Sequence, residues 1–167
     1  DVIKSFIQIL TSKDKTQKLG QVEPVYSITI QELAIQVQLF YDSRQSLITE
    51  RVGADLTRAL YATYLSFLSP NQFTYEIPSF PDQRGLFAEV LKTYDSGQFS
   101  FFTTLPGVTR GQHFHHSKSE KFIIIKGKAR FRFRHLLTNE RFEILATSDN
   151  LKIIETIPGW VHDITNV

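Results

Sequence analysis

The sequence predicts a mainly β protein, a sandwich or small barrel, preceded by a helical segment that includes one strand. From Phe73 onward, short alternating apolar runs are separated by Gly, Asn, Asp and Pro turn signals, as in all-β domains. Before Phe73, apolar residues recur mostly at helical spacing. We therefore expect two parts, residues 1–72 and residues 73–167.

The first part begins with two helical stretches on either side of a candidate strand. VIKSFIQIL (2–10) places apolar side chains at helical spacing, whereas VYSITI (25–30) alternates and is β-branched, as strands are. Thr29 and Glu32 give the T-x-x-E pattern of a capping box. This pattern predicts that a second helix begins there and continues through ELAIQVQLF (32–40).

A third helix is expected over residues 55–68 and should end before Pro70. Its apolar stripe at spacing four is expected in a core and consists of Leu56, Leu60, Tyr64 and Leu68. Six later runs are expected to be strands: FAEVLKTY (87–94), QFSFFTTL (98–105), KFIIIKG (121–127), ARFRFRHLL (129–137), RFEILAT (141–147) and LKIIETI (151–157).

The run KGKARFRFRH (126–135) alternates basic and apolar residues. Phe131 and Phe133 should face a core, and the intervening arginines, Arg130, Arg132 and Arg134, should face the other way. A strand with one solvated basic face is the preferred interpretation. The alternative is a surface that contacts an anionic ligand such as a nucleotide diphosphate.

Composition is that of an ordinary globular protein, with 41% hydrophobic and 22% charged residues among 167. No apolar run has the length of a membrane span, and no signal-peptide pattern opens the chain. The absence of cysteine excludes disulfides and thiolate metal sites and fits the cytoplasm. A net charge of +2 is too small to indicate a nucleic-acid partner.

The ends of the sequence suggest a piece of a longer protein. The chain starts at Asp1 and contains no methionine. It stops at Val167 within an apolar, strand-like pattern, so the second part is expected to be truncated at its C-terminus.

The stretch GQHFHHSKSE (111–120) contains three of the five histidines. In a strand, His113 and His115 would share one face and His116 would point the other way. A hairpin through SKS would return Glu120 to the pair, and a later strand could add His162. Two imidazoles and a carboxylate suit Zn, Fe, Mn or Ni.

The spacing of these residues resembles that of the cupins, jelly-roll barrels that often bind a metal. The first cupin motif is reproduced by Gly107, His113, His115, Glu120 and Gly127. The second is matched by Gly159, His162 and Asn166, although Pro158 precedes Gly159 directly instead of one residue earlier. The resemblance implies a cupin domain over residues 73–167 with His113, His115, Glu120 and His162 as metal ligands. His135 is expected to be structural or exposed.

Three further segments resemble the nucleotide-sugar 3,5-epimerases of the rhamnose pathway: DQRGLFAE (82–89), GVTRGQHF (107–114) and PGWVH (158–162). The resemblance implies that the nucleotide and its phosphates contact Arg84, Phe87 and Glu89. It also implies that Arg110 binds the diphosphate and that His113 lies near the reacting carbon. Guanidinium forks suit phosphate oxygens, and an aromatic face suits a flat base.

The whole chain resembles the bifunctional capsular-polysaccharide enzymes of the CapF type, through YDSRQSL (41–47), LTRALYATYLSFL (56–68) and RGQHFHHSKSEKF (110–122). Those enzymes join an extended short-chain dehydrogenase/reductase domain to a C-terminal cupin. Residues 1–72 would then be the tail of the reductase domain and a linker helix. This sequence lacks the glycine-rich dinucleotide fingerprint, so NADPH-dependent reduction would reside in a part outside it. The resemblance also implies a homodimer.

The chemistry that the resemblance implies is inversion of carbon 3 in a UDP-4-keto-6-deoxy-N-acetylhexosamine, a precursor of N-acetylfucosamine-type capsule sugars. A base removes the proton next to the ketone, and an acid returns a proton to the other face. His113 cannot easily be both a metal ligand and the base, because a ligating imidazole nitrogen has no free lone pair. We prefer His113 as a ligand of a divalent metal, zinc first, and consider His116, Tyr94 and Lys121 as candidate bases.

Two alternatives stay open. An iron-dependent dioxygenase could use the same set of three histidines and one glutamate. A non-catalytic module could bind a sugar nucleotide or a metal without turning it over.

Overall fold

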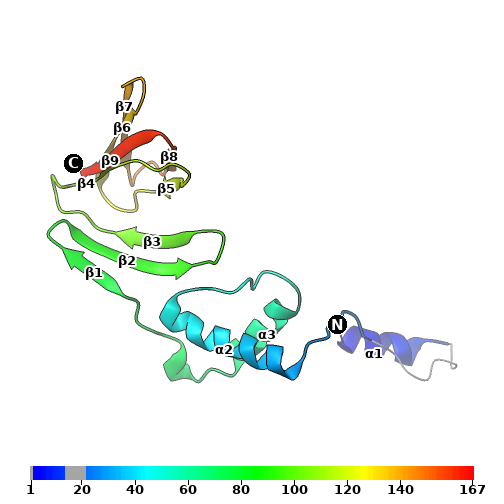
Figure 1. Ribbon diagram of the computed structural model, residues 1–167. Helices are drawn as coiled ribbons and strands as arrows, with labels where there is room; N and C mark the ends of the chain where they lie inside the picture. Colours follow the sequence, from blue (N-terminus) through cyan, green and yellow to red (C-terminus); the bar gives the residue numbers. More distant parts are fainter. Residues whose placement is uncertain (1, 14–21) are drawn as a thin grey trace. The chain divides into compact units, whose positions relative to one another are not determined.

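The computed structural model describes residues 2–13 and 22–167 (Figure 1). The chain divides into two compact units, Asp1–Tyr75 and Glu76–Val167, the first helical and the second made of strands. The mainly β fold class with helices first is therefore confirmed. Within the described ranges, no helix is both long and apolar enough to cross a membrane. The assignment of residues 1–72 to the tail of a reductase domain stays a prediction.

The helical unit contains α1 (Val2–Thr11), α2 (Ile30–Ser46), α3 (Asp55–Ser66) and the 3-10 turn η1 (Pro70–Gln72). The three predicted helices are confirmed. So is the capping box of α2, in which Glu32 N–H donates to Thr29 Oγ1 at 3.2 Å and Thr29 N–H donates to Glu32 Oε2 at 2.9 Å. The helix ends at Ser46 and is capped by Leu47, which adopts a left-handed φ of 59°.

The predicted strand over residues 25–30 is wrong. Residues 25–29 form no strand, and Ile30 is the first residue of α2. No named strand of the described chain lies before Ser79, so this β-branched segment has no neighbour in its unit to complete a ladder. Local strand propensity is overridden here by the helix start at Thr29.

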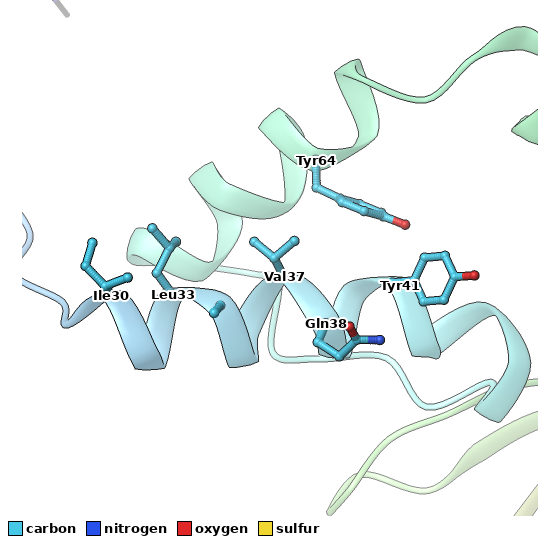
Figure 2. Close-up of a pocket in the computed structure, with 7 residues that line it drawn as sticks. Ile30, Leu33, Val37, Gln38, Tyr41 and Tyr64 are labelled. Atoms are coloured by element: carbon cyan, nitrogen blue, oxygen red, sulfur yellow. The ribbon is translucent and has the colours of Figure 1, made fainter.

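The predicted core stripe of α3 is only half-buried, because none of the side chains of this helix is fully buried. The buried residue of this helix pair is Phe40 of α2, whose ring packs 5.1 Å from Tyr61 and 5.8 Å from Tyr64. An open apolar groove on α2 and α3 is shown in Figure 2 and is lined by Ile30, Leu33, Ala34, Val37, Gln38, Tyr41 and Tyr64.

The second unit contains three antiparallel sheets. The three-stranded sheet has the order β1 (Ser79–Asp82), β2 (Gly85–Lys92), β3 (Gln98–Phe102). The four-stranded sheet has the order β4 (Thr109–His113), β9 (Trp160–Asn166), β6 (Lys128–His135), β7 (Arg141–Thr147). The third sheet pairs β5 (Glu120–Phe122) with β8 (Ile154–Thr156), so both strands are shorter than predicted.

Aromatic contacts join the three sheets around one core. Phe131 of β6 is fully buried, and its ring lies 5.8 Å from Phe122 of β5. Phe122 in turn lies 6.2 Å from Phe102 of β3. The predicted apolar face of β6 is confirmed, because Phe131 and Phe133 are buried. On the other face Arg132 is exposed and donates to Asp163 at 2.9 Å, whereas Arg130 and Arg134 are half-buried. The core side of the four-stranded sheet is thus the side from which odd-numbered residues of β6 project.

Candidate functional site

A β-bulge positions the first histidine of the cluster. β4 pairs with β9, and the register shifts between Gly111 and His113 so that His113 lies opposite His162. Gly111 and Gln112 both adopt positive φ, 99° and 66°. A Cβ on Gly111 would lie only 2.8 Å from the carbonyl oxygen of His162. The close approach therefore requires glycine, and the bulge turns His113 toward His162, with ring centroids 4.8 Å apart.

His115 reaches the same place from a loop, not from a strand. The strand ends at His113, so the predicted strand alternation of residues 113–116 is wrong, although the pairing of His113 with His115 that it predicted is observed. The His115 ring lies 5.0 Å from the His113 ring and 5.7 Å from the His162 ring. Its carbonyl accepts a hydrogen bond from Gly159 N–H at 3.2 Å, which anchors the loop.

Glu120 completes the cluster by a different route from the predicted hairpin. Its strand, β5, pairs with β8 and not with β4, which pairs with β9. The backbone N–H of Glu120 donates to the hydroxyl of buried Thr156 at 3.0 Å. Glu120 Oε2 lies 3.2 Å from Nε2 of both His115 and His162, and Oε1 accepts from Lys118 Nζ at 2.9 Å.

The four side chains fit a single metal ion. One ligand atom from each of His113, His115, Glu120 and His162 lies within 4.8 Å of all the others. Metal–ligand bonds of about 2.0–2.2 Å place the ligand atoms of one ion about 3–4 Å apart, so small side-chain adjustments would close the set. Imidazole nitrogens and a carboxylate oxygen are ligands for first-row divalent metals.

The surroundings of His162 and Glu120 favour the protonation states in which these two residues bind a metal. Burial lowers the pKa of His162, and neighbouring His113 acts in the same direction, so the imidazole is neutral. Burial opposes ionisation of Glu120, but the hydrogen bond and charge of Lys118 keep its pKa below the ordinary value. Metals bind neutral imidazole and ionised carboxylate.

The three candidate bases lie outside this four-residue group. The exposed ring of His116 contacts Phe114 edge-on, 5.1 Å between centroids. Lys121 leaves β5 on the side opposite to Glu120 and forms an ion pair with Glu155 of β8. Tyr94 is exposed after the end of β2. Their catalytic role stays a prediction.

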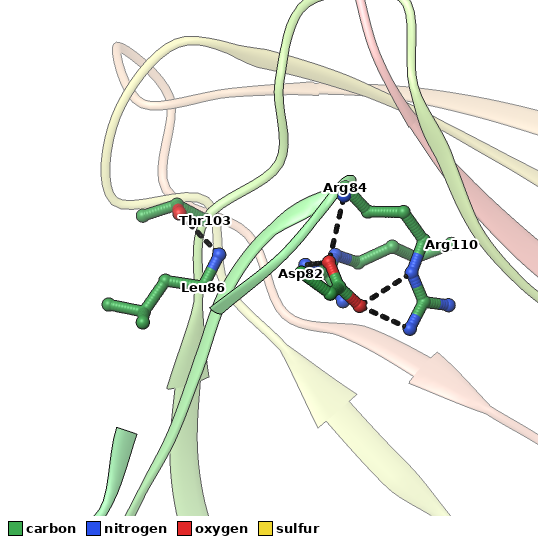
Figure 3. Close-up of polar contacts among 5 residues, drawn as sticks. All are labelled: Asp82, Arg84, Leu86, Thr103 and Arg110. Atoms are coloured by element: carbon green, nitrogen blue, oxygen red, sulfur yellow. Dashed lines mark hydrogen bonds and ion pairs between the residues drawn. The ribbon is translucent and has the colours of Figure 1, made fainter. Parts of the chain in front are cut away.

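A second polar cluster brings two predicted substrate-binding arginines to one carboxylate (Figure 3). Asp82 Oδ2 accepts from Arg84 Nε at 2.9 Å, and Asp82 Oδ1 lies 3.3 Å from Arg110 Nη2. The Arg110 guanidinium lies over the Phe102 ring, 5.5 Å from its centroid. Its Nε is buried and has no hydrogen-bond partner among the residues that the structure describes.

The other two predicted substrate-binding residues lie on β2. Phe87 pairs with Phe102 in the sheet register, and its ring is 6.4 Å from that of Phe80. Glu89 is two residues further along the same face and accepts from Lys92 at 3.2 Å. Phe87, Glu89 and Phe102 therefore share one face of the three-stranded sheet. The Arg110 guanidinium, from β4, lies over the Phe102 ring.

Three residues of the site were not singled out from the sequence. Gly111 permits the bulge, Thr156 anchors Glu120, and Asp82 joins the arginines. The D-x-R pattern of Asp82 and Arg84 was the one available local signal, because an Asp side chain commonly accepts from the N–H two residues on.

The comparisons with known proteins agree with this architecture. The profile of the polysaccharide biosynthesis C-terminal domain family matches residues 80–167, more than half of the chain. The chain belongs to this family. It is also 56% identical over all 167 residues to a Pseudomonas aeruginosa protein named UDP-2-acetamido-2,6-beta-L-arabino-hexul-4-ose reductase, of which it covers 45%.

Two solved structures are similar over almost the whole chain. The capsular polysaccharide assembling protein CapF from Staphylococcus aureus has a TM-score of 0.88 at 31% identity, over 99% of this chain and 45% of that one. CapF with the inhibitor 3-isopropenyl-tropolone has a TM-score of 0.90 at 32% identity, over 99% and 48%. The predicted resemblance to CapF-type enzymes and their cupin fold is therefore confirmed. The chain spans a little under half the length of these relatives.

Proposed function

We propose that residues 76–167 form a nucleotide-sugar epimerase site that inverts carbon 3 of a UDP-4-keto-6-deoxy-N-acetylhexosamine for capsular polysaccharide synthesis. The name of the Pseudomonas aeruginosa relative supports this substrate class, since it specifies a UDP-linked hexul-4-ose, a 4-keto sugar. The similarity to CapF supports the pathway.

One observation carries the proposal: two of the four ligands, His113 and His162, share one sheet face with an arginine. Arg110 lies opposite Ile164, and His113 lies opposite His162, two residues away on β9. Two residues of a strand span roughly 7 Å, a separation that a sugar bonded to a diphosphate can bridge. A diphosphate at Arg110 would therefore place the attached sugar ring beside the histidines.

Each group has a distinct task in this proposal. Arg84 and Arg110 bind the diphosphate, since guanidinium forks match phosphate oxygens. Phe87 and Glu89 receive the nucleoside. A divalent metal on the four ligands would supply positive charge to the ketone oxygen and so acidify the proton at carbon 3.

His113 serves as a ligand in this account, and a different side chain moves the proton. His113 itself is exposed, and its ring lies against those of His115 and His162, with centroids 5.0 and 4.8 Å away. A ligating nitrogen cannot accept a proton. We propose His116 first as the base, since it follows His115 directly and its ring is exposed, with Tyr94 and Lys121 after it.

Several finer assignments belong to the same proposal. Zinc is the first choice of metal because it accepts imidazole and carboxylate ligands and has no redox chemistry of its own. NADPH-dependent reduction at carbon 4 would be carried out by the remainder of a longer protein. A cytoplasmic location, the absence of nucleic-acid and membrane partners, and a homodimer complete the proposal.

Exchange with deuterated water tests the proposed reaction. The metal-loaded chain should introduce one deuterium at carbon 3 of the UDP-4-keto sugar without consuming oxygen. His115→Ala should abolish the exchange, whereas His135→Ala, which alters a histidine outside the cluster, should retain it. Oxygen consumption would indicate the dioxygenase, and binding of the sugar nucleotide without exchange would indicate a non-catalytic module.

A further inference from the structure

We propose that Asp82 is a positioning residue that holds Arg84 and Arg110 together as one diphosphate-binding pair. This inference rests on the proposed function and assigns a role to a carboxylate that would not itself contact the substrate. Its basis is that one carboxylate contacts both arginines, of which Arg84 lies in the β1–β2 turn and Arg110 in β4 (Figure 3).

The backbone around Arg84 is fixed before its side chain is considered. Asp82 Oδ1 accepts from the N–H of Arg84 at 2.8 Å, which closes a turn between β1 and β2. The carbonyl of Arg84 accepts from Leu105 N–H at 2.9 Å, and Leu86 N–H donates to Thr103 Oγ1 at 3.1 Å. The position of the guanidinium therefore depends on the remaining side-chain contact.

That contact is the carboxylate of Asp82. Its Oδ2 accepts from both Nε and Nη2 of Arg84, at 2.9 and 2.6 Å. The Arg84 side chain is 50% exposed, so little else restrains it. Arg110, only 13% exposed, is already held by the Phe102 ring beneath it. Asp82 thus brings the loosely held arginine to the fixed one.

The net charge of Asp82 and the two arginines favours a role in which Asp82 positions the guanidinium groups over one in which it occupies the phosphate site. Two guanidinium groups that share one carboxylate keep a net charge of +1, whereas without Asp82 they would repel each other and Arg84 could swing into water. Each guanidinium has five N–H donors, and Asp82 uses two from Arg84 and one from Arg110. Donors therefore remain for phosphate oxygens. Hydrogen bonds from Arg84 also hold the pKa of Asp82 below its ordinary value, so the carboxylate is ionised at neutral pH.

The alternative role for the Asp82 carboxylate is that of a competitor, which would occupy the place of the phosphate on the two arginines. A competitor and a positioning residue predict opposite signs when the charge is removed. Asp82→Asn is the decisive variant because it keeps an oxygen for Arg84 N–H and Arg110 Nη2 but replaces the acceptor of the Arg84 guanidinium, Oδ2, with an amide donor.

Calorimetric titration of the metal-loaded chain with UDP and with uridine tests the role. For Asp82→Asn we expect about 10-fold weaker UDP binding, equivalent to about 1.4 kcal/mol. Uridine binding, metal content and thermal midpoint should stay unchanged. Asp82→Ala should lose at least as much UDP affinity, and Gln83→Ala, in the same turn, should bind UDP as the unaltered chain does.

Equal or tighter UDP binding by Asp82→Asn would overturn the positioning role while leaving the proposed function intact. A parallel loss for uridine would also overturn it, because the effect would then not concern the phosphates. If the unaltered chain binds no UDP, both this inference and the proposed function are wrong. If Asp82→Ala fails to fold, UDP binding by the near-isosteric Asp82→Asn still decides between the positioning role and the competitor role.

Discussion

Replacing Gly111 with alanine tests how the fold builds the metal site. Gly111 has a φ of 99°, a conformation that an L side chain rarely adopts. The new Cβ would lie 2.8 Å from the carbonyl oxygen of His162 and 3.0 Å from Cα of Asp163. Both contacts are with the backbone of β9, so no side-chain rotation can relieve them.

The structure allows the size of the effect to be estimated. The positive φ costs alanine about 1–2 kcal/mol. The approach to His162 is about 0.6 Å short of the 3.4 Å at which ordinary contact begins, so the two strands must separate. A weakened ladder hydrogen bond adds about 0.5–1.5 kcal/mol, which gives roughly 1.5–3.5 kcal/mol in total. Because His113 and His162 are opposite each other at this bulge, metal affinity should also fall, by about 10- to 100-fold.

Urea unfolding of the metal-free chain and metal titration against a chelator measure the two effects. Gly97→Ala is the matched control, since Gly97 has a φ of 94° but no atom within 4 Å of a new Cβ. The control should lose only the conformational part, about 1–2 kcal/mol, with unchanged metal affinity. Equal losses of stability and unchanged metal affinity in both variants would refute the reasoning.

Further predictions concern other parts of the chain. The N–H of Thr29 holds the pKa of Glu32 below its ordinary value of 4.5. The stabilisation of α2 by this contact is therefore present above about pH 4.5 and lost as the pH falls through the lowered folded-state pKa. Circular dichroism should show this acid-dependent loss of helix in the unaltered chain and not in Glu32→Gln. Phe131→Ala should cost about 3–5 kcal/mol in urea unfolding, because the ring is fully buried; a loss below 1 kcal/mol would contradict its place in the core. Thr156→Val should cost about 1–3 kcal/mol by leaving the Glu120 N–H unsatisfied, and no loss would mean that this N–H finds another acceptor. Arg110→Lys should weaken UDP binding about 10-fold and leave uridine unaffected, since lysine lacks the guanidinium fork; unchanged UDP binding would exclude Arg110 from the diphosphate site.

The sequence predicted which residues would meet better than how they meet. His113, His115, Glu120 and His162 follow a spacing that depends on the whole barrel, so their convergence could be expected from the motif. The route could not, because it depends on non-local strand pairing: β4 pairs with β9, and β5 pairs with β8. The β-bulge before His113 and the loop that carries His115 bring these two side chains together, which simple strand alternation was expected to do.

Local sequence patterns predicted the correct element where the strand they indicated also had neighbouring strands to pair with. Phe131 and Phe133 alternate with arginines in a strand that has neighbours on both sides, and their burial followed. VYSITI (25–30) has the same kind of local pattern, but the described part of its unit holds no named strand to pair with it, so its propensity was overridden. The contact of Asp82 with Arg110 joins residues 28 positions apart, which no local pattern encodes.

Phosphorus NMR of UDP bound to the cobalt-loaded chain tests most directly whether the metal cluster and the arginine pair form one substrate site. With Co²⁺ on the four ligands, the β-phosphorus should relax faster than in the zinc-loaded chain and faster than the α-phosphorus. The reason is that Arg110 and His113 lie about two strand residues apart, roughly 7 Å, on one face. His115→Ala should abolish the enhancement. Relaxation of bound UDP that is the same with cobalt and zinc, or an α-phosphorus that relaxes faster than the β-phosphorus, would contradict the account.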